Sequence, residues 1–233
     1  MGIILEYKSI TKNFGDKEVL KNINLQIPTN KVVGLLGKNG SGKSTLFKLA
    51  NDLLTPTSGE VLIDGKNISP ETKKIVSYLP ERSYLDPGLK VCEVVKFFET
   101  FYEGFDKQKA EKLLEDLKLD KNMKLSKMSK GMKEKVQLVL VMSRNAKLYI
   151  LDEPLGGVDP ASRDYILQTI LKNFNKDATL LISTHMISDI EKILDEVIFI
   201  DDGEIVLQEN ADTLREESKS TIDELFRRRF YVK

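Results

Sequence analysis

Residues 37–44 constrain this chain more than any other segment, because they read GKNGSGKS. Two glycines separated by four residues, followed by a lysine and a hydroxyl residue, let the backbone turn tightly enough to point several N–H groups at phosphates. The lysine, Lys43, then reaches the terminal phosphates, and the hydroxyl of Ser44 can ligate Mg2+. The segment therefore predicts that the chain binds a nucleoside triphosphate.

The same pattern requires a strand before the loop and a helix after it. Residues 32–36 form a short apolar run, VVGLL, which predicts a buried strand. Apolar residues then recur near helical spacing from Thr45 to Leu54, which predicts a helix whose N-terminus faces the phosphates. The expected phosphate contacts are Gly37, Asn39, Gly40, Ser41, Gly42, Lys43, Ser44 and Thr45. A glycine-rich surface turn is the alternative, and the flanking elements count against it.

Composition narrows the class of protein and its surroundings. A chain of 233 residues with 41% hydrophobic content can bury the core of one large domain, or of one domain with an inserted lobe. Basic and acidic residues number 36 each, so the net charge gives no reason to expect a nucleic-acid partner. The one cysteine, Cys92, excludes an internal disulfide framework and favours a reducing cytosol. No stretch approaches about 18 uncharged apolar residues, so we expect another subunit to make any membrane crossing.

The order of the predicted elements indicates an α/β fold. Alternating apolar and polar residues over 3–7 and 22–27, on either side of a turn signal at 15–16, predict an antiparallel β region. Further strands are expected over 61–63, 75–79, 148–151, 178–183 and 197–200, with helices near 162–174 and 187–194. Strands that alternate with helices form a mostly parallel sheet.

Two other regions differ from this α/β texture. From about residue 91 to 144 the apolar pattern turns helical, which predicts an inserted helical lobe. A hairpin over 201–207 precedes a charged helical tail. We therefore predict one domain over residues 1–233, built on a P-loop NTPase (RecA-like) core with an antiparallel β subdomain. Its parts are the core (1–81 and 148–210), the inserted α-helical subdomain (about 82–147) and the C-terminal helical tail (211–233).

Acidic residues end one of the predicted core strands. Residues 149–151 lead directly to Asp152 and Glu153, at the carboxyl edge of the sheet, where nucleotide sites form. Asp152 is placed to hold Mg2+, and Glu153 to polarise a water for in-line attack on the γ-phosphate. His185, the only histidine, follows another strand, where an imidazole could hydrogen-bond the γ-phosphate or the attacking water. Without the phosphate loop, a helix-capping acid and a structural histidine would be the ordinary interpretations.

With these motifs in order, the chain resembles the nucleotide-binding subunits of ABC transporters over roughly residues 3–210. The resemblance implies that Phe14 stacks on adenine and that Glu81 stands at the Q-loop position, where its carboxylate could ligate Mg2+. It also implies that Gly156, Gly157, Val158 and Asp159 form the D-loop. The expected cofactors are ATP and Mg2+.

The resemblance further implies that such subunits work in pairs, because the signature motif of one subunit faces the γ-phosphate bound by the other. Here the signature would contain Ser129 and Gly131, although the usual LSGGQ reads MSKGM over residues 128–132. Ser129 can still cap a helix, and Lys130 either favours the anion or faces water. Glu81 replaces the usual glutamine. These departures leave open whether the chain is an active subunit or the weakly hydrolysing, regulatory half of a heterodimer.

The function implied by the resemblance is ATP hydrolysis that drives transport through a separately encoded membrane-spanning subunit. The chain would then be cytoplasmic and peripheral on the inner face of the cell membrane, paired with a second ABC ATPase subunit in a homodimer or heterodimer. The short single cassette and the segment YLPE over residues 78–81 look most like bacterial exporter-type systems. A soluble, non-transport ABC ATPase is the other class, but its usual marks, two cassettes or a long inserted coiled coil, are not found in this sequence.

Two further segments allow two interpretations each. Residues 94–105, VVKFFETFYEGF, are rich in aromatic side chains, which either form the core of the helical lobe or receive a helix of the membrane partner. Arg227, Arg228 and Arg229 either lie on a solvated tail helix or contact anionic lipid or the partner.

Overall fold

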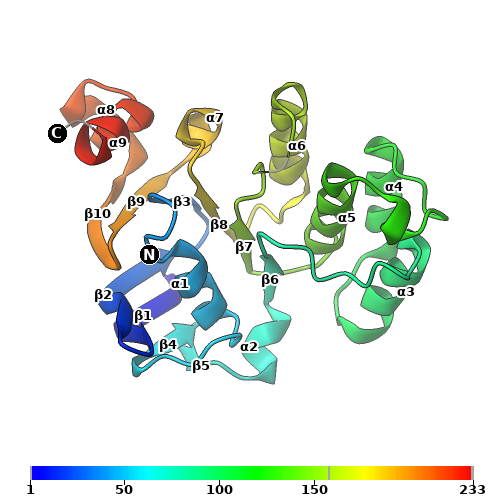
Figure 1. Cartoon of the computed structure of the whole chain (residues 1–233), viewed down its shortest axis with the longest axis horizontal. Coiled ribbons are helices and arrows are strands. Elements are labelled where there is room, and N and C mark those ends of the chain that lie inside the picture. The colour runs from blue at the N-terminus through cyan, green and yellow to red at the C-terminus, as the bar shows by residue number, and fades with distance from the viewer. Residues whose placement is uncertain (1, 157, 232–233) are drawn as a thin grey trace.

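The smaller of two sheets is antiparallel in the computed structural model, which describes residues 2–156 and 158–231 (Figure 1). Its strand order is β2-β1-β4-β5, with β1 over Ile3–Phe14, β2 over Lys17–Pro28, β4 over Ser58–Ile63 and β5 over Lys66–Asn67. Both long strands extend beyond the predicted segments. The β1–β2 register shifts between Tyr7 and Ile10, where Ser9 has a φ of 49°, and this shift interrupts the period-two pattern that the prediction followed.

The larger sheet has the strand order β10-β9-β3-β8-β7-β6. Its strands are β3 (Val32–Leu36), β6 (Val76–Leu79), β7 (Leu148–Asp152), β8 (Thr179–Thr184), β9 (Glu196–Asp201) and β10 (Glu204–Asn210). All neighbours are parallel except β9 and β10, which form the predicted hairpin. The carboxyl ends of the parallel strands therefore meet at one edge, and the predicted α/β fold is confirmed.

Helices surround the two sheets (Figure 1). They are α1 (Lys43–Ala50), α2 (Pro70–Lys74), α3 (Val91–Phe101), α4 (Lys107–Asp116), α5 (Lys130–Met142), α6 (Pro160–Asn173), α7 (Ile187–Ile190), α8 (Ala211–Ser218) and α9 (Ile222–Phe230), with short 3-10 turns at Leu125–Lys127 and Glu191–Ile193. In Figure 1, α3, α4 and α5 are drawn in green and gather on the side opposite to the red tail helices α8 and α9. None of the helices within 2–156 and 158–231 is both long and apolar enough to cross a membrane.

The helix after the phosphate loop is shorter than its apolar pattern predicts, because a Schellman motif ends α1 at Ala50. Asp52 has a φ of 57°, its N–H donates to the carbonyl of Leu49, and the next N–H, of Leu53, donates to Lys48. Leu53 is consequently 60% exposed instead of continuing the buried stripe.

The helix predicted over 187–194 is also shorter, since α7 makes a single turn before a 3-10 turn takes over. Asp195 explains the early end. Its N–H donates to the carbonyl of Val32 at 2.8 Å, and its Oδ2 accepts from the N–H of Val32 at 2.7 Å. The chain must leave the helix to make this pair, which sets the start of β9 beside β3.

A hydrophobic core between the two sheets fixes the helix that carries the phosphate loop. Leu46 and Phe47 of α1 are fully buried there, together with Leu5 and Ile10 of β1. The hydroxyl of Tyr7 donates to the carbonyl of Leu46 at 2.9 Å. Burying such side chains contributes about 1.5–3 kcal/mol each, so the position of α1 against both sheets is strongly determined.

Candidate active site

A cavity of about 920 Å³ opens over the phosphate loop at the carboxyl edge of the larger sheet. It is lined by predicted site residues from distant parts of the chain: Phe14, Asn39, Gly40, Gly42, Lys43, Ser44, Thr45, Glu81, Glu153 and His185. Phe14 is the last residue of β1 and is half exposed at the cavity. The ammonium of Lys12 lies 5.0 Å from the centroid of its ring. The fold thus brings the phosphate loop, the aromatic residue, Glu153 and the histidine around one space, while Asp152 is buried and is not part of the described lining.

Glycines are required in the loop because of both backbone angles and space. Gly42 has a φ of 111°, and a Cβ there would lie 2.7 Å from the side chain of Leu20. A Cβ on Gly37 would lie 2.5 Å from the carbonyl oxygen of Ile200 and 2.6 Å from the hydroxyl of Ser41. The described lining of the cavity does not include Gly37 or Ser41, and Ser41 is buried.

Lys43 lies at the start of α1 with its side chain only 7% exposed. Its ammonium donates to the carbonyls of Gly37 at 2.7 Å and Lys38 at 3.1 Å, and lies 3.9 Å from Oε1 of Glu153. Burial lowers the pKa of Lys43, while the nearby carboxylates, Glu153 first, oppose this shift. The loop therefore carries a partly desolvated cation directed at the cavity, where an anionic group would compensate it.

Asp152 ends β7 and is 2% exposed. Burial raises its pKa, and the hydroxyl of Ser183, which donates to Oδ1 at 2.6 Å, opposes that rise. Within residues 2–156 and 158–231, no three His, Cys, Asp or Glu side chains are grouped to hold a metal ion by themselves. The oxygen donors of Ser44 and Asp152 nevertheless fit Mg2+, which takes one or two protein oxygens together with substrate phosphates. A divalent cation would also offset the desolvation of Asp152.

Glu153 follows directly and takes a left-handed backbone conformation with a φ of 51°. Its N–H donates to both the hydroxyl and the carbonyl oxygen of Ser183, each at 3.1 Å. A non-glycine residue at positive φ carries strain, and these bonds to β8 hold it in place. The unusual backbone turn directs the carboxylate back over the sheet edge, towards both Lys43 and His185.

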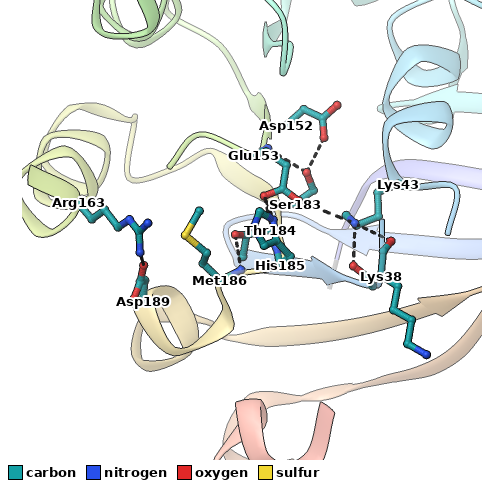
Figure 2. A network of polar contacts seen from close by, with 11 residues as sticks. Lys38, Lys43, Asp152, Glu153, Arg163, Ser183, Thr184, His185, Met186 and Asp189 are labelled. Carbon is teal, nitrogen blue, oxygen red and sulfur yellow. Dashed lines mark hydrogen bonds and ion pairs between the residues drawn. The ribbon is translucent and has the colours of Figure 1, made fainter. Parts of the chain in front are cut away.

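Glu153 and His185 form a side-chain pair at the carboxyl edge of the sheet, as Figure 2 shows. Oε2 of Glu153 lies 2.9 Å from Nδ1 of His185 and accepts from the His185 N–H at 3.3 Å. The carboxylate is 11% exposed and the imidazole 47%, so the acid is enclosed while the ring remains accessible. A carboxylate beside a histidine and a lysine can act as a base while its partners bind anionic oxygens.

Three of the predicted site residues lie elsewhere. Ser129 caps α5 by accepting the N–H of Met132 at 3.3 Å, with Gly131 in the first turn. Asp159 caps α6 by accepting the N–H of Ser162 at 3.2 Å, and hydrogen bonds from the side chain and the backbone of Ser162 lower the pKa of Asp159. None of these three residues belongs to the described lining of the cavity. Gly157, predicted in the D-loop, lies outside the described residues.

Lys130 lies between Ser129 and Gly131 in the signature segment and differs from both of them. Lys130 lines the cavity, is 83% exposed and lies 3.8 Å from Glu134 one helical turn further on. Its charge is therefore solvated and only weakly held, since exposed pairs of this kind contribute about 0.3–0.5 kcal/mol. Both interpretations of Lys130 given by the sequence remain compatible with this position.

Sequence reasoning missed two features of the site. Ser183 binds the backbone of Glu153 and the side chain of Asp152, and its place at the end of a buried strand was the available signal. Arg163 of α6 contacts both α7 and the segment that precedes α6, and Figure 2 shows its contact with Asp189. Its Nη1 lies 3.3 Å from Asp189 of α7, and its Nε donates to the carbonyl of Val158 at 3.3 Å. No sequence motif indicated that contact.

Comparison with known proteins agrees with this geometry. The family model described as ABC transporter matches residues 20–156, more than half of the chain. The chain therefore belongs to the ABC transporter family as an ATP-binding subunit, and it is an ABC ATPase.

Similar curated proteins carry different transport names. The chain is 30% identical to the ABC transporter ATP-binding protein YtrB of Bacillus subtilis (strain 168), over 92% of this chain and 74% of that one. It is 30% identical to the lantibiotic transport ATP-binding protein SrtF of Streptococcus pyogenes, over 96% of both chains. It is 31% identical to the glutamine transport ATP-binding protein GlnQ of Escherichia coli (strain K12), over 91% of this chain and 93% of that one.

Solved structures show the same fold. An ATP-binding subunit of an ABC transporter superimposes with a TM-score of 0.85 at 28% identity, covering 96% of this chain and 98% of that one. The dimeric bacterial ABC transporter cassette MJ0796 gives a TM-score of 0.78 at 27% identity, covering 89% and 99%. A second structure of MJ0796 is a post-hydrolysis dimer bound to ADP and Pi, with the same TM-score, identity and coverage.

Proposed function

We propose that this chain hydrolyses ATP at an interface between two cassettes and thereby drives export through a separately encoded membrane subunit. The observation that carries the proposal is the position of Glu153, enclosed between the ammonium of Lys43 and the imidazole of His185 at the mouth of the phosphate loop. A binding module would need the lysine but has no use for a strained, enclosed carboxylate beside it.

The proposed chemistry assigns a role to each residue of the cavity. Lys43 and the backbone N–H groups of the loop bind the β- and γ-phosphates, and Phe14 stacks on adenine. Ser44 and Asp152 would hold Mg2+, with Glu81 as a further oxygen ligand, and the ion would neutralise charge on the phosphate oxygens.

Glu153 is the proposed general base. Its carboxylate accepts a proton from a water aligned with the γ-phosphate, while His185 keeps the carboxylate oriented and donates to a γ-phosphate oxygen. Ser183 holds this arrangement in place, because its hydroxyl accepts from the backbone N–H of Glu153 and donates to the side chain of Asp152. General-base catalysis of this kind contributes about 10²–10⁴-fold in rate.

The second subunit completes the site in this proposal. Ser129 and Gly131 lie at the N-terminus of α5 and Asp159 at that of α6, and none of the three belongs to the described lining of the cavity over the chain's own phosphate loop. A helix N-terminus with a serine cap suits an anion, so α5 fits the γ-phosphate bound by a facing copy or a related cassette. The dimer of MJ0796, a cassette of the same fold, supports such a pairing.

The remaining parts of the chain would connect ATP binding to a membrane. We propose that residues 1–81 and 148–210 form the nucleotide-binding core, about 82–147 the helical subdomain and 211–233 the tail. On α3, Phe98 is buried, whereas Phe97 and Phe101 are 50% and 68% exposed and lie 4.6 Å apart between ring centroids. Both interpretations of this segment therefore apply, with Phe98 in the core and the exposed pair free to meet a helix of the membrane subunit. The location that follows is the cytoplasmic face of the membrane.

One observation favours a second candidate function. Met132 replaces the signature glutamine, and its side chain packs against the core instead of offering an amide to a facing nucleotide. The chain would then be the weakly hydrolysing, regulatory half of a heterodimer. A soluble, non-transport ABC ATPase has no such support.

Purification of the chain from its native membranes tests these proposals together. The expected result is a complex with a membrane-spanning subunit, with ATP hydrolysis by this chain alone or by its homodimer. Hydrolysis that appears only after a second, co-purifying cassette is added would support the regulatory candidate. In vesicles reconstituted so that the cassettes face outward, ATP added outside should drive substrate into the lumen, away from the cassettes. ATP-driven movement of substrate from the lumen towards the cassette side would contradict export.

A further inference from the structure

The side chain of Lys38 leaves the phosphate loop on the side away from the cavity. In Figure 2 it extends away from Lys43 and Glu153. Its ammonium lies 5.6 Å from the ring centroid of Phe230 and 5.1 Å from that of Tyr231, both at the end of the tail helix α9. Cations within about 6 Å of an aromatic ring face are attracted to it. The loop is therefore joined to a segment almost two hundred residues further along the chain.

The two rings belong to an aromatic cluster that packs against the sheet through Phe199. Phe230 is 8% exposed, and its ring centroid lies 4.4 Å from that of Phe226 and 5.8 Å from that of Phe199 on β9. Phe199 is the register partner of Leu36, the last residue of β3 before the loop. Tyr231 is 66% exposed and lies at the edge of this cluster. The aromatic cluster thus forms a fixed support directly behind the start of the phosphate loop.

Backbone contacts connect this support to the phosphate-binding groups. The carbonyl of Lys38 accepts from the ammonium of Lys43 at 3.1 Å, so the backbone of Lys38 helps to place the phosphate-binding cation. On the far side of the loop, the N–H of Gly203 donates to the carbonyl of Ser41 at 3.1 Å. Holding the Lys38 side chain therefore restrains the turn that also sets the position of Lys43.

We propose that Phe230 and Tyr231 are positioning residues for the nucleotide site, and that they act by holding the Lys38 side chain so that the phosphate loop keeps its phosphate-binding conformation. The proposal deepens the proposed function and rests on the role given there to Lys43. It makes the C-terminal helix a determinant of nucleotide affinity although the tail contributes no lining residue to the described cavity. A loop that keeps its binding conformation for only part of the time binds with an affinity reduced by that fraction.

The test is a double-mutant cycle in the full chain, with ADP and Mg2+ as the probe in titration calorimetry. Tyr231→Leu and Lys38→Gln should each weaken ADP binding by about two- to fivefold, the factor that corresponds to one exposed cation–π contact. The double variant should bind no more weakly than Lys38→Gln alone, since Lys38→Gln already removes the contact with Tyr231. Tyr231→Phe keeps the ring and should bind like the unaltered chain.

Two controls separate the proposed role of the tail from the proposed nucleotide-binding function of the chain. Lys43→Ala should abolish ADP binding, and failure of that control would contradict the phosphate role of Lys43 and not the tail contact alone. Thermal unfolding without nucleotide, measured on every variant, detects a general loss of structure. Two results would overturn the proposal: unchanged ADP affinity in Tyr231→Leu, or additive losses in the double variant. Additive losses would show that Lys38 acts on the phosphates directly and independently of the tail.

Discussion

Substituting Ser183 by alanine should reveal how the fold holds two adjacent acids at the sheet edge. The Ser183 hydroxyl is the buried donor to Asp152 at 2.6 Å, and a hydrogen bond to an ionised group contributes about 1.5–3 kcal/mol. Ser77→Ala is the matched control, because Ser77 is equally buried and donates to the carbonyl of Val141 at 2.9 Å. That carbonyl also accepts from the N–H of Arg144, so loss of the Ser77 hydroxyl should lower the free energy of unfolding by only about 0.5–1.5 kcal/mol.

The pH dependence distinguishes the two serines. Burial raises the pKa of Asp152, so between its unfolded and folded pKa values the folded protein keeps a proton that the unfolded chain has released. The contribution of Asp152 to the free energy of unfolding is therefore lost as pH rises through the folded pKa. The bond from Ser183 opposes the pKa rise because it stabilises the carboxylate. Its removal should therefore cost about 1 kcal/mol while Asp152 is protonated and about 1.5–3 kcal/mol once Asp152 is ionised.

Urea unfolding followed by circular dichroism measures these differences at several pH values, from about 4, near the ordinary pKa of an aspartate, up to about 8. Circular dichroism is used because the sequence contains no tryptophan for a fluorescence signal. The free energy lost in Ser183→Ala should grow with pH, while the loss in Ser77→Ala stays constant. A Ser183→Ala loss that shrinks as pH rises, or that is no larger than the Ser77→Ala loss at the highest pH, would refute the assignment of this bond to an ionised Asp152.

Two further changes test local features of the fold by thermal or urea unfolding. Gly203→Ala places a Cβ 2.4 Å from the carbonyl oxygen of Val19 at a φ of 80° and should cost at least about 2 kcal/mol, whereas Gly65→Ala, with a φ of 71° and open space, should cost about 1 kcal/mol; equal costs would contradict the steric argument. Phe98→Ala removes a buried ring of α3 and should cost about 3–5 kcal/mol, against less than about 0.5 kcal/mol for the exposed Phe97→Ala; a large loss for Phe97 would place that ring in the core.

Sequence patterns identified the core elements because their constraints are local. The strand Val32–Leu36 has the bounds predicted for it, since an apolar run between a lysine and a glycine-rich loop fits a short buried parallel strand. Asp152, Glu153 and His185 were also predictable as neighbours, because the carboxyl ends of parallel strands meet at one edge. These are consequences of strand order and periodicity alone.

Other features depend on contacts that periodicity does not contain. The early end of α1 depends on the left-handed conformation of Asp52, and an apolar stripe cannot show it. The hydroxyl contacts of Ser183 and the aromatic contacts of Lys38 join residues from separate elements. Side-chain directions within the site, above all that of Glu153, follow from a strained backbone turn that the residue type gives no reason to expect.

The central claim, that Glu153 activates water for ATP hydrolysis, is tested most directly by the steady-state rate of phosphate release in Glu153→Gln. Glu115→Gln, an exposed acid on α4 away from the cavity, is the matched control. Glu153→Gln should lose at least about 100-fold in rate while still binding ATP, and Glu115→Gln should keep the unaltered rate. A Glu153→Gln variant that releases phosphate as fast as the unaltered protein would contradict the claim.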